Sequence, residues 1–122
     1  MRDYDVSEEL VALLSDLAES KAAVIVEGRK DKAALVKIGI YNNSIFVLNT
    51  KPLFSVAEEV AANFEKAAIL TDLDAEGKKL YGKLNTLLQR LGVKVDNSIR
   101  NFLFKNTKLR QIEGIANIIR QQ

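Results

Sequence analysis

The sequence predicts an α/β fold, in which helices flank a parallel sheet of four strands arranged in the order 2-1-3-4 and a helical tail follows. Two observations support this class. Short apolar runs rich in β-branched residues alternate with stretches of helical periodicity, as in strands joined by right-handed helical crossovers. The length of 122 residues favours a single domain over residues 1–122 with one core.

The expected strands are short apolar runs without helical periodicity, which is typical of strands covered on both faces. They span residues 22–26, 45–48, 67–70 and 93–95. Each expected helix places apolar side chains three and four positions apart. With Ser7 as the N-cap of the first, the core helices span residues 7–20, 31–38, 53–64 and 76–91.

The tail is expected to form C-terminal helices over residues 98–120. One covers about residues 98–105, although the run Arg-Asn-Phe-Leu-Phe at 100–104 is also compatible with a strand. The other covers about residues 107–120, where apolar residues recur at helical spacing.

The residue types that are missing limit the chemistry. The chain has neither cysteine nor histidine, which excludes disulfides, thiolate or imidazole zinc sites and a histidine general base. A metal ion would be held by oxygen, which favours Mg²⁺, Ca²⁺ or Mn²⁺. No apolar run approaches the roughly 20 residues that span a bilayer, and the N-terminus lacks the apolar stretch of a signal peptide. We therefore expect a cytoplasmic protein with no membrane partner.

Charge is distributed unevenly along the chain. Residues 1–77 hold 8 Lys/Arg against 14 Asp/Glu, a net charge of −6, whereas residues 78–122 hold 10 against 2, a net charge of +8. This asymmetry indicates a polyanionic partner for the C-terminal half. The alternative is a solvated helical surface rich in lysine, and charge alone does not separate the two.

Acidic residues follow two of the expected strands. Glu27 ends the first strand, and Asp72 and Asp74 follow the third. In the order 2-1-3-4 these strands are neighbours, and ligands of parallel sheets bind beyond the carboxyl ends where the strand order reverses. Asp72 and Asp74 point to the same side of an extended segment. Three converging carboxylates repel one another unless a cation neutralises them, which predicts an Mg²⁺ site with Mn²⁺ as a substitute.

Each of these signals also has a purely structural interpretation. Glu27 and Gly28 form a common type of turn sequence, and Asp72 or Asp74 is a suitable cap for the helix expected to start near residue 75. The metal interpretation is favoured because the acids fall at the same end of adjacent strands.

Two segments at these strand ends resemble the signature motifs of Toprim domains, namely residues 24–35 (VIVEGRKDKAAL) and residues 69–80 (ILTDLDAEGKKL). The resemblance covers about residues 20–97 and is closest to small stand-alone Toprim proteins of archaea and bacteria. It implies a Rossmann-like sheet, the fold shared by type IA and type II topoisomerases, bacterial-type primases, OLD-family nucleases and the small ribonucleases that mature 5S ribosomal RNA.

The resemblance also implies roles for individual residues. Glu27 matches the family's general acid/base or metal ligand, and Asp72 and Asp74 match its metal-binding pair. Gly28 and Gly77 match glycines at tight turns, where a Cβ would obstruct.

Of two further positions, one matches the family and one departs from it. Asp31 matches an acidic position common after Glu-Gly, and its alternative role is a favourable charge in the first turn of a helix. Lys78 stands where type IA topoisomerases usually have Glu. Because this length also leaves no room for a domain with a nucleophilic tyrosine, strand passage is not expected.

Basic residues at the same end of the sheet are expected to contact nucleic-acid phosphate beside the metal. These are Arg29, Lys30, Lys51 and Lys78. The alternative for each is an ordinary exposed charge. Tyr81 is expected to pack against the core. The basic residues of the tail either extend a nucleic-acid track or face water, and they are Lys105, Lys108, Arg110 and Arg120.

These features support two functions. The first is an Mg²⁺-dependent nuclease that hydrolyses phosphodiester bonds of RNA or DNA, with Glu27 as the proton carrier. The second is a binding module without turnover, which docks nucleic acid or joins a larger RNA- or DNA-processing complex. The intact set of three acids favours the nuclease, whereas the small size favours the module.

Overall fold

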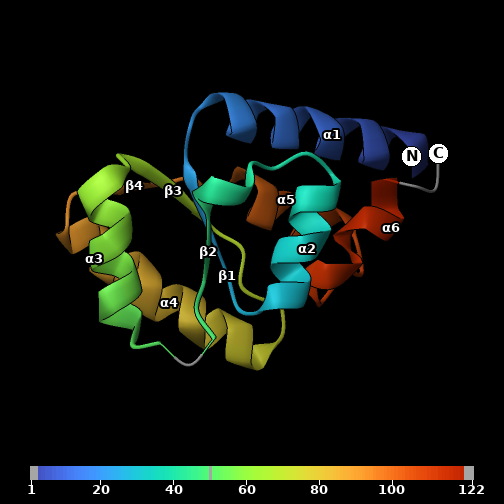
Figure 1. Ribbon diagram of the computed structural model, residues 1–122. Coiled ribbons are helices and arrows are strands. Elements are labelled where there is room, and N and C mark those ends of the chain that lie inside the picture. The colour runs from blue at the N-terminus through green and yellow to red at the C-terminus, as the bar shows by residue number, and fades with distance from the viewer. Residues whose placement is uncertain (1–2, 50, 120–122) are drawn as a thin grey trace.

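The computed structural model describes residues 3–49 and 51–119 and confirms the predicted fold class (Figure 1). All strands are parallel, and their order is β2-β1-β3-β4. Val24 at the centre of the sheet lies opposite Ile45 on one side and Ala68 on the other. The strands are β1 (Ala23–Val26), β2 (Ile45–Val47), β3 (Lys66–Ile69) and β4 (Lys94–Val95).

Helices cover both faces of the sheet. Alternate strand residues point to opposite sides, so β1 contributes to a core cluster on each face. Val24 and Val26 belong to the core cluster shared with α1, α2, α5 and α6. Ala23 and Ile25 belong to the cluster shared with α3 and α4. Figure 1 shows α3 and α4 on one side of the strands and α2, α5 and α6 on the other. The α-helices are α1 (Asp3–Glu19), α2 (Arg29–Lys37), α3 (Leu53–Asn63), α4 (Ala75–Arg90), α5 (Ser98–Asn106) and α6 (Ile115–Ile119), and short 3₁₀ turns are η1 (Asn42–Ser44) and η2 (Ile112–Gly114). In the described residues, no helix is long and apolar enough to cross a membrane.

Two helices begin earlier than the sequence predicts. The first, α1, begins at Asp3, so Ser7 lies inside the helix and is not its N-cap. Ser7 is buried, and its hydroxyl donates to the carbonyl oxygen of Ile119 at 3.4 Å. The helix after β1 begins at Arg29, which leaves Gly28 at the N-cap position.

The second tail helix is much shorter than the predicted range of residues 107–120. After α5, which is a helix and not a strand, the chain runs without regular structure to η2, and only Ile115–Ile119 form α6. Backbone groups that a helix would use internally bond instead to the loop after β3. The carbonyl oxygen of Arg110 accepts from the N–H of Leu73 at 2.7 Å, and the N–H of Ile112 donates to Asp72 Oδ1 at 2.8 Å.

Candidate metal and nucleic-acid site

The ends of β1 and β3 lie side by side at the point where the strand order reverses. Glu27 follows β1, and Asp72 lies beyond β3. The backbone N–H of Asp72 donates to Glu27 Oε2 at 2.8 Å. This bond brings the two acids together at the carboxyl edge of the sheet, the edge where parallel sheets bind their ligands.

The loop from Asp72 to Gly77 is folded tightly onto itself. Asp74 is the N-cap of α4, and its Oδ1 accepts from the N–H of Gly77 at 2.8 Å. The hydroxyl of Thr71 donates to the carbonyl oxygen of Gly77 at 2.7 Å. A Cβ on Gly77 would overlap the carbonyl oxygen of Asp72. The loop therefore needs glycine at this position, and Asp74 has the capping role that was the structural alternative.

Gly28 differs from Gly77. A Cβ on Gly28 would meet no atom closer than Asp31 Oδ2 at 3.9 Å, and the backbone is extended, with φ −143°. The expectation that a Cβ would obstruct here is wrong, because the turn after β1 has space for a side chain.

Arg100 of α5 supports the loop after β3, and the sequence offered no signal for it. Only 8% of its surface is exposed. Its guanidinium donates to the carbonyl oxygens of Thr71 at 2.6 Å and Asp72 at 3.0 Å, with a longer contact to Ile69 at 3.5 Å. The guanidinium carbon also lies 4.8 Å from the ring centroid of Tyr81.

The guanidinium of Arg100 also places a positive charge beside the acids. Burial lowers the pKa of Arg100, and the nearby Tyr81, Glu27, Asp72 and Asp74 act in the opposite direction. Repulsion among the acids is therefore partly balanced by a cation of the protein itself. Residues 98–105, which the sequence predicted to be a helix or a strand, thus contribute a buried charge to the site through Arg100.

The acids at this edge influence one another. The pKa of Glu27 is raised, mainly because burial disfavours its charge; the N–H of Asp72 opposes this, and the charges of Asp72, Asp74 and Asp31 add to it. The pKa of Asp31 is also raised by burial. Asp31 is 8% exposed, and its Oδ2 accepts from the N–H of Gly28 at 3.0 Å. Asp31 thus holds the turn after β1 and contributes negative charge to the site.

The carboxylates fit a hard cation in chemistry, although they do not form a ready-made cage. Among the described residues, no group of three or more acids lies close enough together to hold one ion. One oxygen of each of Glu27, Asp72 and Asp74 accepts from a backbone N–H, and the other receives no hydrogen bond from the described residues. Mg²⁺ commonly takes only one or two carboxylates and keeps several waters. A donor set made of oxygen therefore suits Mg²⁺ better than a softer metal.

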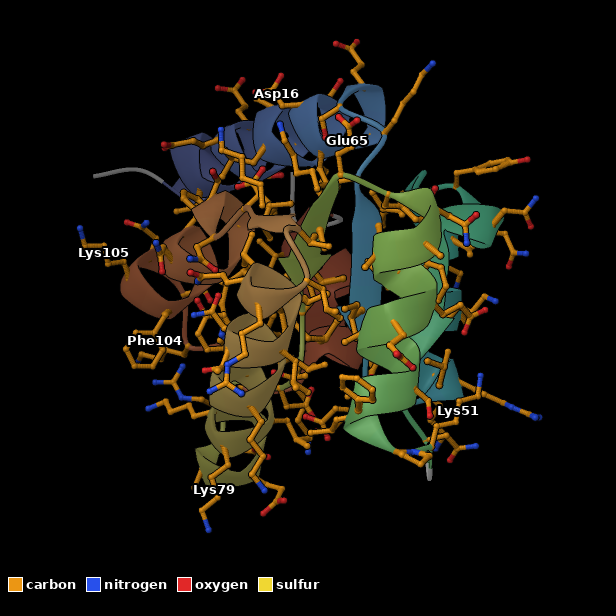
Figure 2. All side chains as sticks on the ribbon, turned by 90° about the vertical axis from the view of Figure 1, so that its left-hand side faces the viewer. Asp16, Lys51, Glu65, Lys79, Phe104 and Lys105 are labelled. Carbon is orange, nitrogen blue, oxygen red and sulfur yellow. The ribbon has the colours of Figure 1, made fainter. Side chains whose placement is uncertain are left out.

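The basic residues expected to contact phosphate fall into two groups. Arg29 and Lys51 line a cavity of about 620 Å³ beside β2, together with Lys32 and Lys37, which sequence analysis did not select. Lys78 lies in the first turn of α4, with its Nζ 4.5 Å from the ring centroid of Phe104. In Figure 2, Lys51 and Phe104 lie on opposite sides of the molecule.

Lys30 belongs to neither group. It is exposed in the first turn of α2 and does not line the cavity. The four predicted contacts therefore do not form one cluster.

Known proteins are similar to this chain in sequence and in fold. The family model for the Toprim domain matches residues 21–97. A UPF0292 protein of Pyrococcus horikoshii is 38% identical over 107 residues, which cover 88% of this chain and 79% of that protein. A UPF0292 protein of Methanocaldococcus jannaschii is 30% identical over 128 residues, with 100% of this chain and 98% of that protein covered. A solved structure of a protein from Aquifex aeolicus has a TM-score of 0.77 at 34% identity, covering 87% of this chain and 94% of that one.

The strand order and the acids at the switch point define a Rossmann-like α/β protein whose candidate site lies at the carboxyl edge of its sheet. The chain belongs to the Toprim domain family. Over most of its length it is similar to UPF0292 proteins.

Proposed function

We propose that this protein is an Mg²⁺-dependent nuclease that hydrolyses phosphodiester bonds in RNA or DNA. The observation that carries the proposal is the pairing of Glu27 with Asp72 across two adjacent strand ends, fixed by the 2.8 Å bond from the Asp72 N–H. Asp74, on the same loop, adds a third carboxylate. A carboxyl group with a raised pKa, as at Glu27, is typical of a functional site when it lies at the switch point of a parallel sheet.

Each acid has a role that its environment supports. Asp72 and Asp74 would hold the metal through the carboxylate oxygens that the backbone leaves free. Bound Mg²⁺ would polarise the scissile phosphate and stabilise the leaving oxygen. Glu27 has a raised pKa, so it is suited to carry a proton between water and the departing strand. Lys78 in the first turn of α4 supplies positive charge for phosphate.

A binding module without turnover is the second candidate, and one observation favours it. The carboxylates of Asp72 and Asp74 already accept hydrogen bonds from Ile112 and Gly77. These acids therefore have a structural use that needs no catalysis. In this case the fold would dock nucleic acid through Mg²⁺ and lysines, and the acids would be retained for the loop.

A cleavage assay separates the two candidates. End-labelled single-stranded and duplex RNA and DNA are incubated with Mg²⁺, Mn²⁺ or EDTA. We expect cleavage that needs the metal and that falls by about 10²–10⁴-fold in Glu27→Gln, the usual contribution of an acid/base group. Asp72→Asn is expected to lose metal dependence and activity together. Glu65→Gln is the matched control, because Glu65 is exposed and precedes β3 at the opposite end of the sheet (Figure 2).

Three outcomes are informative. Metal-dependent cleavage that Glu65→Gln retains and Glu27→Gln loses supports the nuclease. Salt-sensitive binding with no cleavage of any substrate supports the module. Failure to bind any of the nucleic acids at low salt with Mg²⁺ would contradict both, and the basic half would then be better explained as a docking surface for an acidic protein.

A further inference from the structure

Phe104 is an exposed aromatic ring beside the candidate site. Its neighbours Phe102 and Leu103 are buried in the core, whereas 47% of the surface of Phe104 is exposed. Figure 2 shows Phe104 and Lys105 projecting from α5 toward the edge of the molecule. The Nζ of Lys78 lies 4.5 Å from the centroid of the ring, and the guanidinium carbon of Arg110 lies 5.5 Å from it.

Both cations belong to segments bonded to the acidic loop. The backbone N–H of Lys78 donates to the carbonyl oxygen of Asp74 at 3.0 Å, and the carbonyl oxygen of Arg110 accepts from the N–H of Leu73 at 2.7 Å. Phe104 is therefore placed next to the loop that carries Asp72 and Asp74. Lys78 and Arg110 thus connect the ring of Phe104 to the loop that carries the acids.

We propose that Phe104 is a stacking platform for an unpaired nucleobase, so that the strand bound at the site is single-stranded there. This inference rests on the proposed function and specifies its substrate class. The ring stacks one base, while Lys78 and Arg110 bind the flanking phosphates. Because phenylalanine has no hydrogen-bonding group, the platform holds bases of any sequence.

Physical chemistry favours a base over the cations as the partner of this ring. Contacts between a surface cation and an aromatic ring are weak, and stacking of a base on an exposed aromatic side chain is stronger. A base that displaces a cation also brings a phosphate, to which the freed cation can bind. In a duplex the bases are already paired and stacked, so the ring has no free face of a base to contact.

The chain contains no tryptophan, so Phe104→Trp introduces a single fluorescent reporter at the platform. We expect single-stranded oligonucleotides to quench its emission on binding, and a duplex of the same sequence to leave it nearly unchanged. Tyr41→Trp is the matched control. Tyr41 is also an exposed aromatic residue, at 66%, but it precedes β2 at the opposite end of the sheet. Its emission should not respond to either ligand.

Affinity measurements complete the test. Phe104→Ala should weaken single-strand binding about tenfold, equivalent to about 1.4 kcal/mol, whereas Phe104→Tyr and Tyr41→Ala should bind as the wild type does. Because Phe104→Ala removes no charge, the dependence of affinity on salt should stay the same; Lys78→Ala should reduce that slope by about 1.

The inference and the proposed function fail in different ways. Equal quenching by duplex and single strand, or unchanged single-strand affinity of Phe104→Ala, would overturn the platform and leave the nuclease assay unaffected. Absence of cleavage, with quenching by single strands retained, would overturn the nuclease and leave the platform. A wild-type protein that binds no single strand at low salt would overturn the platform as well.

Discussion

The two acidic strand ends look alike in sequence, but the protein holds them in different ways. The turn after β1 is stabilised by near neighbours along the chain. The N–H of Gly28 donates to Asp31 Oδ2 at 3.0 Å, and the N–H of Lys32 donates to the carbonyl oxygen of Gly28 at 3.2 Å. The bonds of the Gly28 turn itself therefore lie within one short segment, although Glu27 before it also accepts from the N–H of Asn49 at 2.9 Å and from the N–H of Asp72 at 2.8 Å.

The loop after β3 depends on residues far along the chain. Arg100, Arg110 and Ile112 all bond to the stretch between Ile69 and Leu73 or to the Asp72 carboxylate. These three residues lie outside the part of the chain that matches the Toprim family model, which ends at residue 97. The second Toprim motif can therefore be recognised from its own residues, but the geometry of its loop depends on tail residues that lie outside the motif.

Replacing Arg100 tests this dependence most severely. Arg100→Met removes the donor for the carbonyl oxygens of Thr71 and Asp72 and a positive charge beside the acids. We expect the free energy of unfolding to fall by about 3 kcal/mol, as for the loss of buried hydrogen bonds to a charged group. Urea denaturation measures this. Arg90→Met, at the exposed C-terminal turn of α4, should change stability by less than about 0.5 kcal/mol. Equal effects of the two substitutions would refute a supporting role for Arg100.

A pair of glycine substitutions compares the two strand ends directly. In Gly77→Ala the new Cβ overlaps the carbonyl oxygen of Asp72, and the backbone of the loop must move. We expect a loss of about 1–3 kcal/mol, the usual range for overpacking. In Gly28→Ala the nearest atom to the new Cβ is Asp31 Oδ2 at 3.9 Å, an ordinary van der Waals distance. We therefore expect only the loss of about 0.5 kcal/mol that comes from alanine being a poorer N-cap than glycine.

Thermal melting of both proteins, without added metal, checks the glycine pair. If Gly28→Ala proves as damaging as Gly77→Ala, the turn after β1 is as constrained as the loop after β3, and the contrast between them is lost.

Sequence patterns predicted the parts of the fold that depend on local periodicity. The strands, the helices between them and the order 2-1-3-4 agree with the structure because each rests on apolar spacing or on the rules of parallel crossovers. That order also brought Glu27 next to Asp72.

The sequence-based predictions were wrong or incomplete in the tail, where the chain bonds to distant residues and not to near neighbours. The apolar spacing of residues 107–120 favours a helix, but the backbone of Arg110 and Ile112 bonds to the loop after β3 instead. The charge of Arg100 was equally unpredictable, because buried arginines occur only where partners exist, and its partners precede it by about 30 residues. No periodicity or spacing within the tail indicates these pairings.

Removing the charge of Glu27, at the end of β1, should have the smallest effect on stability. The pKa of Glu27 is raised above its ordinary value of 4.5, mainly by burial. The folded protein therefore binds a proton more tightly than the unfolded chain does. Stability contributed by this group must fall as the pH rises through the window from 4.5 to the folded pKa.

Glu27→Gln removes that charge and keeps an oxygen that can accept from the Asp72 N–H. In EDTA at neutral pH, we expect the variant to be as stable as the wild type or slightly more stable, with the difference vanishing below pH 4.5. Urea midpoints at several pH values measure it, and Glu65→Gln shows the effect of removing an exposed charge elsewhere. Added Mg²⁺ should reverse the order, because an ion that binds the folded wild type more tightly than the folded variant stabilises the wild type more by mass action. A variant that is clearly less stable at neutral pH without metal would contradict this expectation. The bond from Glu27 to the Asp72 N–H would then stabilise the fold more than the neighbouring carboxylates destabilise it, and the main role of Glu27 would be structural.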